Sequence, residues 1–131
     1  MADPLHVELV SVEREIWSGE ADEVLARTVE GELGILPNHA PLLGQLADGG
    51  VVEIRRTDGD ALKVAAHGGF LSVSKAGVSV LAETAELGED IDTERAREAL
   101  RRAQEAGPDD EDAHAAELRA MSRLRAAGEQ V

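Results

Sequence analysis

The side chains in this sequence that could do chemistry are mainly arginines, and they are unevenly distributed. All seven cationic side chains of residues 92–131 are Arg, whereas residues 1–91 carry 17 acids and only six Lys or Arg. A guanidinium group binds carboxylates and phosphates through paired hydrogen bonds. The cationic groups available to an anionic ligand are therefore enriched in the C-terminal part of the chain.

The histidines do not form a recognisable catalytic pattern. None is paired at the spacing of metal ligands; the four are His6, His39, His67 and His114. We expect His6 on a strand face, His67 in a turn before two glycines and His114 in solvent. The chain has no P-loop, nucleophile elbow or His-Glu-x-x-His motif. We therefore expect no catalytic residue and no metal site, and a protein that is not an enzyme.

The composition argues against several classes of partner. A net charge of −14 and only two aromatic residues, Trp17 and Phe70, disfavour nucleic acid and direct docking on anionic lipid. The absence of cysteine excludes disulfides and thiolate chemistry. We expect no signal peptide, and no apolar run approaches the roughly 18 residues of a membrane span. Any link to a membrane would have to pass through a partner.

The first part of the chain has the pattern of antiparallel strands. Apolar and polar residues alternate over residues 5–9, as on a half-buried strand. Short glycine-containing loops at 57–60 and 74–77 separate apolar runs in the manner of β-hairpins. These runs predict strands over 51–56, 61–68, 70–73 and 78–83. No helix of about 12 or more residues fits before residue 90, so we expect an antiparallel sandwich or barrel with an aliphatic core.

From Asp92 onward the composition changes to good helix formers. Asp92 is suited to cap a first helix, and Gly107 followed by proline is a stop signal. A second helix is expected to begin in the acidic run 109–112 and to end at Gly128. The pattern predicts a helical hairpin, with a domain of residues 1–88 followed by a two-helix domain of residues 89–131.

The apolar stripes of both predicted helices consist mostly of alanine. They are Ala96, Ala99, Leu100, Ala103 and Ala106 on the first helix, and Ala113, Ala116, Ala120, Leu124 and Ala127 on the second. A buried leucine contributes roughly 1.5–3 kcal/mol, and alanine much less. Two interpretations stay open: a marginally closed hairpin that moves, or a stable hairpin packed on the sandwich.

Residues 31–44, GELGILPNHAPLLG, combine apolar residues with two prolines. Pro37 restricts its own φ, and Pro41 favours extended geometry at Ala40. We expect a stiffened link between strands. Its anchors in the core are expected to be Ile35, Leu36, Leu42 and Leu43.

Three segments of the sequence carry a resemblance to a known family. EGELGILPNHAPLL, then GGFLSV, then LAETAELGEDIDTERA resemble the epsilon subunit of bacterial F-type ATP synthases. The resemblance runs from Leu5 to about Leu124. It implies an N-terminal antiparallel β-sandwich of about ten strands, followed by a C-terminal α-helical hairpin.

The resemblance also implies a function. It implies a non-catalytic rotor subunit of the central stalk of a proton-translocating synthase, bound to the gamma subunit and to the ring of c subunits. The helices of this family inhibit ATP hydrolysis when they extend along gamma toward the alpha and beta subunits. The expected location is the cytoplasmic face of the bacterial cell membrane, as a peripheral protein without direct membrane insertion. The coupling ion is decided in another subunit.

Some family members bind ATP in the folded-down helices, with or without magnesium, as a regulatory ligand and not as a required cofactor. By resemblance, the residues of such a site here are Ile91, Asp92, Arg95, Ala96, Arg119 and Arg123, with Glu86 as a further candidate. The spacing of Arg119 and Arg123 puts both on one helix face. Against this interpretation stands the neighbouring acidic run 109–112, which would repel a triphosphate.

The resemblance also makes Glu32 and His39 the candidate contacts with the rotor. His39 could instead stabilise the turn through a hydrogen bond. Two other functions remain as alternatives to the rotor subunit. One is a free-standing nucleotide-sensing module that uses the arginines of the hairpin, and the other is a small enzyme of the sandwich type.

Overall fold

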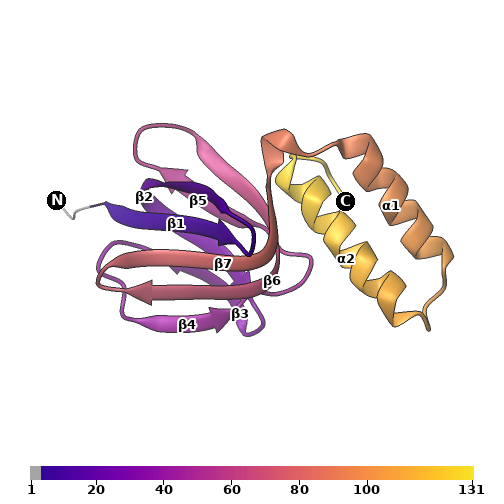
Figure 1. Cartoon of the computed structure of the whole chain (residues 1–131), viewed down its shortest axis with the longest axis horizontal. Coiled ribbons are helices and arrows are strands. Elements are labelled where there is room, and N and C mark those ends of the chain that lie inside the picture. The colour runs from indigo at the N-terminus through magenta and orange to yellow at the C-terminus, as the bar shows by residue number, and fades with distance from the viewer. Residues whose placement is uncertain (1–3) are drawn as a thin grey trace.

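The computed structural model describes residues 4–131, which form a β-sandwich followed by a pair of helices (Figure 1). The first three residues of the expected domain 1–88 lie outside the described residues. The strands are β1 (Leu5–Ser11), β2 (Glu15–Thr28), β3 (Gly31–Ile35), β4 (Leu42–Gln45), β5 (Val52–Arg56), β6 (Ala61–Ser74) and β7 (Gly77–Leu87). The one-turn 3₁₀ helix η1 (Gly88–Asp90) connects β7 to the helices α1 (Thr93–Glu105) and α2 (Glu111–Ala126).

The strands pair in the order β1-β7-β6-β5-β2-β3, and a further β1–β2 pairing closes the sheet on itself. Most pairs are antiparallel, but β1 runs parallel to β7. β4 pairs with the second half of β6, from Leu42 opposite Val73 to Gln45 opposite Phe70. Two hairpins have the short loops that the sequence predicts, between β5 and β6 and between β6 and β7.

The described chain has seven strands and not the expected ten or so. The count is lower because two long strands, β2 and β6, each contain segments that could be counted as separate strands. The first half of β2 pairs with β1 and its second half with β3 and β5. Similarly, the predicted strands 61–68 and 70–73 are one strand, β6, which pairs first with β5 and then with β4. Gly68, with φ of 61°, adopts a backbone conformation that glycine tolerates, and β6 keeps a single register with β7 on both sides of it.

The core between the two layers is aliphatic, as the composition predicts. Leu5, Val7 and Leu9 of β1 are buried, and the residues between them are exposed, which confirms the alternation read from the sequence. The largest fully buried side chains are Leu9, Ile35, Ile54 and Leu71. Trp17 lies at the margin of this core, and Phe70 is exposed.

The proline-containing link between β3 and β4 is anchored less completely than expected. Ile35 is fully buried and Leu42 packs on the core, but Leu36 and Leu43 are exposed. The prediction of four anchors is therefore wrong for two of them. Leu43 is exposed because successive side chains of β4 point to opposite faces. Leu42 points inward, so Leu43 must point outward.

Both helices begin at a capping aspartate, and the first of these caps, Asp92, follows the sequence prediction. The Asp92 carboxylate accepts a hydrogen bond from the Arg95 backbone N–H at 3.1 Å, and Asp110 accepts one from Ala113 N–H at 3.0 Å. Such caps satisfy N–H groups that the helix itself leaves unpaired. Gly107, with φ of 94°, follows α1 and turns the chain into the hairpin.

The hairpin is docked on the sandwich through α2, which lies between the sheet and α1 (Figure 1). Small residues allow this close approach. A Cβ atom placed on Gly88 would lie 2.1 Å from the Ala126 carbonyl oxygen at the end of α2. Ala65 of β6 packs with Ile91 and Ala126 in a small apolar cluster. The division of the chain into a domain of residues 1–88 and a two-helix domain of residues 89–131 stays a prediction.

Gly88→Ala should loosen the hairpin, because the added methyl group would overlap backbone atoms that cannot move aside. We expect a destabilisation of about 1–3 kcal/mol, seen in urea unfolding and in faster hydrogen exchange of α2 amides. Gly59→Ala is the matched control, because a Cβ atom there meets nothing closer than 3.8 Å. Equal effects of the two substitutions would contradict the close-packing argument.

Candidate functional site

The interface between α2 and the sandwich brings several of the implied site residues together. Ser122, fully buried on α2, donates a hydrogen bond from Oγ to the Gly50 carbonyl oxygen at 2.6 Å. Arg125 Nη1 donates to the neighbouring Gly49 carbonyl oxygen at 2.8 Å. Both bonds end on backbone carbonyl groups of the loop between β4 and β5. They fix the position of α2 along the sheet.

An ion pair joins the other side of α2 to the end of β7. Arg123 Nε lies 3.3 Å from Glu86 Oε1, and both side chains are partly exposed. These two residues belong to the implied ATP site, and the fold brings them together. Arg119, one turn before Arg123, is exposed on the same helix. Two guanidinium groups thus lie along one edge of the docked helix.

The remaining residues of the implied ATP site have structural surroundings of their own. Ile91 and Ala96 are buried, and Ile91 packs in the small apolar cluster at the end of α2. Asp92 is the cap of α1. Arg95 is exposed in the first turn of α1. A ligand held here would therefore meet side chains from the sandwich edge and from both helices.

The acidic run 109–112 does not lie beside these arginines. Asp110 caps α2, and Glu111 and Asp112 occupy its first turn, where negative charge is favourable. Arg123 is about 18 Å farther along the helix axis than Glu111, at about 1.5 Å per residue. Screening in salt solution weakens repulsion over such a distance. The acidic run therefore repels an anionic ligand at these arginines less than the sequence suggests.

His67 is the residue that sequence reasoning missed. We expected it in a turn, but it lies within β6 opposite Thr84, and only 7% of its surface is exposed. Within residues 4–131, neither of its ring nitrogens has a hydrogen-bond partner. Burial, then the charges of Arg123 and Arg119, lower the pKa of His67 to about 4, against an opposing effect of Asp48. The two glycines that follow it suggested a turn, but both lie within β6, where Gly69 pairs with Ala82 of β7.

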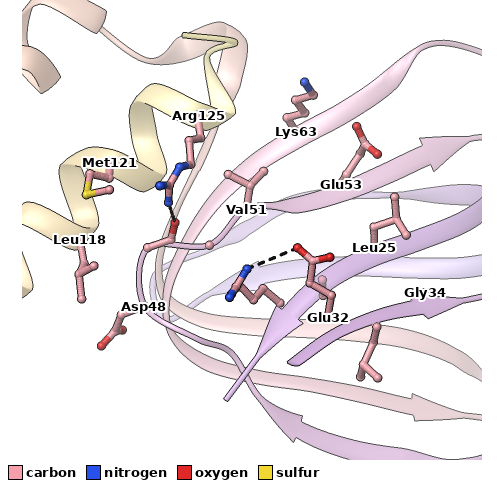
Figure 2. Close-up of a pocket in the computed structure, with 15 residues that line it drawn as sticks. Leu25, Glu32, Gly34, Asp48, Val51, Glu53, Lys63, Leu118, Met121 and Arg125 are labelled. Atoms are coloured by element: carbon pink, nitrogen blue, oxygen red, sulfur yellow. Dashed lines mark hydrogen bonds and ion pairs between the residues drawn. The ribbon is translucent and has the colours of Figure 1, made fainter. Parts of the chain in front are cut away.

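The side of α2 that carries Leu118, Met121 and Arg125 borders a groove of about 840 Å³ (Figure 2). Leu118 and Met121 face it from α2, and Leu25 and Val51 face it from the sandwich. Arg125, which donates a hydrogen bond to the Gly49 carbonyl oxygen, also lines the groove from α2. Arg119 and Arg123 do not line this groove, so it is separate from the implied ATP site.

The two implied rotor contacts lie at the exposed edge of the sandwich. Glu32 of β3 is solvent-exposed and forms a long ion pair with Arg27, at 3.5 Å. His39 is exposed in the link between β3 and β4, where Nδ1 lies 2.7 Å from the Ala40 carbonyl oxygen. This contact agrees with the turn-stabilising interpretation, and exposure leaves the ring accessible to a partner.

Comparison with known families decides the class of protein. Residues 4–88 match the model of the ATP synthase delta/epsilon chain β-sandwich domain. The chain belongs to the ATP synthase epsilon-chain family. Members of this family are non-catalytic subunits of the central stalk. In the described part of the chain, neither helix is long and apolar enough to cross a membrane.

Curated relatives of the chain carry the same family name over most of its length. It is 52% identical over 126 residues to the ATP synthase epsilon chain of Thermobifida fusca, which covers 94% of this chain and 91% of the relative. It is 56% identical over 94 residues to that of Rhodococcus opacus, covering 72% of this chain and 77% of the relative. The matches thus include the helical part as well as the sandwich.

A solved structure also has the same arrangement. The chain resembles a subunit of the Euglena gracilis mitochondrial ATP synthase, solved with OSCP, F1 and the c-ring. The TM-score is 0.80 at 28% identity, and the match covers 96% of this chain and 82% of that one. The likeness therefore extends over both the sandwich and the helical hairpin.

Proposed function

We propose that this chain couples the gamma subunit to the c ring and regulates ATP hydrolysis with its C-terminal helices. The regulatory role is supported by the limited contact between the helical hairpin and the sandwich. α1 packs mainly on α2, and α2 docks on β6 and on η1, with the Arg123–Glu86 ion pair to the end of β7. The apolar cluster at this interface is small, and its polar contacts can be replaced by water. The hairpin can therefore undock from the sandwich without disturbing the sandwich core.

An exposed apolar row supports binding to the gamma subunit. Phe70 of β6 is paired with Leu81 of β7, which is paired in turn with Val10 of β1. Leu43 of β4 lies on the same outer face. About half or more of the surfaces of Phe70, Leu81 and Leu43 is exposed. Clustered exposed side chains of this kind mark protein interfaces.

The polar edge near Glu32 and His39 suits the polar loops of a c ring. Both side chains are accessible, and neither supports the core. A peripheral location on the cytoplasmic face of the bacterial membrane, reached through such partners, follows from this proposal. It accords with the net charge of −14, which disfavours direct contact with anionic lipid.

His39→Ala should weaken assembly or coupling modestly while the fold persists, because the ring is exposed and its hydrogen bond is local. The measurement is proton-coupled ATP synthesis by the assembled complex, with circular dichroism of the free chain alongside. His114→Ala is the matched control, since His114 is another exposed histidine, on the distant α2 helix. Loss of the fold in His39→Ala would assign this ring a structural role instead.

Deletion of residues 92–131 should raise ATP hydrolysis by the assembled synthase severalfold, because the inhibitory helices are gone. Gly88→Ala gives a test of opposite sign, since it releases the helices without removing them and should lower hydrolysis. ATP synthesis serves as the control for intact coupling. Unchanged hydrolysis in the deletion would remove the inhibitory role and leave the coupling role standing.

ATP sensing by the hairpin is the further part of the proposal. The Glu86–Arg123 pair joins sandwich and helix, and Arg119 lies one turn away. A triphosphate that replaces Glu86 as the partner of Arg123 would bridge α2 to the start of α1 near Asp92 and Arg95. Such a ligand stabilises the docked hairpin only by its difference in affinity between the docked and released forms.

Equilibrium dialysis of the isolated chain should detect ATP binding in the millimolar range or better, with and without magnesium. Arg119→Ala and Arg123→Ala should each weaken it about tenfold or more, the cost of a charge-assisted hydrogen bond. Arg101→Ala is the control, because Arg101 is already bonded to Glu98 and Glu105 on α1. The Arg101 guanidinium also lowers the pKa of Glu98.

The same experiment separates the second candidate function, a free-standing nucleotide-sensing module. Binding by the isolated chain with no change in hydrolysis after the deletion of residues 92–131 would favour the module. Absence of binding at millimolar ATP would eliminate both the module and the sensing role. The rotor role does not depend on this result.

A further inference from the structure

His67 lies on the face of β6 that the docked hairpin covers and that an undocked, or released, hairpin would expose. Successive residues of a strand point to opposite faces, so His67 points to the same side of β6 as Ala65. Ala65 packs in the cluster with Ile91 and Ala126, whereas Ala66 belongs to the sandwich core. The imidazole is therefore directed toward the docked helices and not into the sandwich.

The ring is buried at this interface without a hydrogen bond. Only 7% of His67 is exposed, and no group among residues 4–131 bonds to Nδ1 or Nε2. A buried polar group without a partner costs free energy, so it calls for an explanation. Burying the same ring with a positive charge would cost considerably more.

The charged groups around the ring disfavour a further positive charge. Arg119 and Arg123 approach it from α2, and Asp48 approaches from the loop between β4 and β5. On β7, Glu86 lies on the same face, but it is paired with Arg123. Glu83 of β7 lies against the neighbouring Gly68. Both arginines belong to α2. When α2 undocks, His67 therefore loses both the electrostatic repulsion and the burial.

We propose that His67 is an acid-sensitive latch: the docked α2 accepts only the neutral imidazole, and proton uptake by this ring releases the helical hairpin. The released ring is exposed to water and free of both arginines. The latch concerns the docked form alone. It stands whether or not the released helices inhibit hydrolysis and whether or not the hairpin binds ATP.

The direction of the effect follows from linkage. Docking lowers the pKa of His67 from 6.5 to about 4, so docking is favoured fully above pH 6.5 and progressively less as the pH falls toward 4. With these two values, the ratio of released to docked hairpin rises about tenfold between about pH 7.5 and about pH 5.5. Most of the change therefore occurs while the carboxylates of the protein remain ionised.

Hydrogen exchange of the full chain measures this ratio even when the released form is rare. A hairpin of this length is marginally helical on its own, so its amides exchange when it is released. After correction for intrinsic exchange rates, the protection of α2 amides should fall about tenfold from about pH 7.5 to about pH 5.5. The protection of β1 and β7 amides should fall much less, because the sandwich stays folded.

Three variants identify the titrating group. His67→Gln cannot take up a proton, so its α2 protection should lose the pH dependence. His6→Gln removes an exposed histidine of β1 and should keep the tenfold change. Arg119→Gln removes one repelling charge from the exposed surface of α2, so it should reduce the change without abolishing it.

A direct titration keeps the proposal testable if His67→Gln folds poorly. The imidazole of His67 in the full chain should titrate below about pH 5 by NMR, because burial and the two arginines lower its pKa to about 4. A His67 pKa of 6.5 or higher would overturn the latch. So would unchanged α2 protection between the two pH values, or an undiminished change in His67→Gln.

Discussion

The close approach of α2 to the outer face of β6 is the contact on which the rest of the structure depends. It is possible because small residues meet there: Ala65 on the strand, Gly88 after β7 and Ser122 on the helix. Ser122 and Arg125 then bond to successive backbone carbonyl groups of one loop. The docked helix brings Arg123 to Glu86, buries His67 and forms one wall of the groove. None of these features survives if α2 moves away.

The two parts of the molecule are held by different kinds of interaction. The sandwich has a continuous aliphatic core, whereas the apolar cluster between sandwich and hairpin has only Ala65, Ile91 and Ala126 as its buried members. Burial of apolar area supplies most of the free energy of folding, so the sandwich is the more stable part. The regulatory role that we propose needs this difference, because the sandwich would stay attached to its partners while the helices change position.

Some local features could be predicted from the sequence because neighbouring residues determine them. The alternation of β1, the Asp92 cap and the two short hairpin loops follow from local periodicity, capping and turn chemistry. The four-residue spacing of Arg119 and Arg123 likewise predicted that both lie on one face of a helix. The prediction for His67 was wrong because two successive glycines are typical of a turn, and only the pairing with β7 places them inside a strand.

The sequence by itself determined the family, the change from strands to helices near residue 90 and the arginine-rich character of the hairpin. The tertiary structure alone decided which groups meet: Glu86 with Arg123, Ser122 with Gly50, and His67 with the charged edge of α2. The physical reason is that these pairs are separated by 37 to 72 positions in the chain. Local propensity fixes the direction of a side chain relative to its own element, but only the packing of elements fixes what that side chain faces.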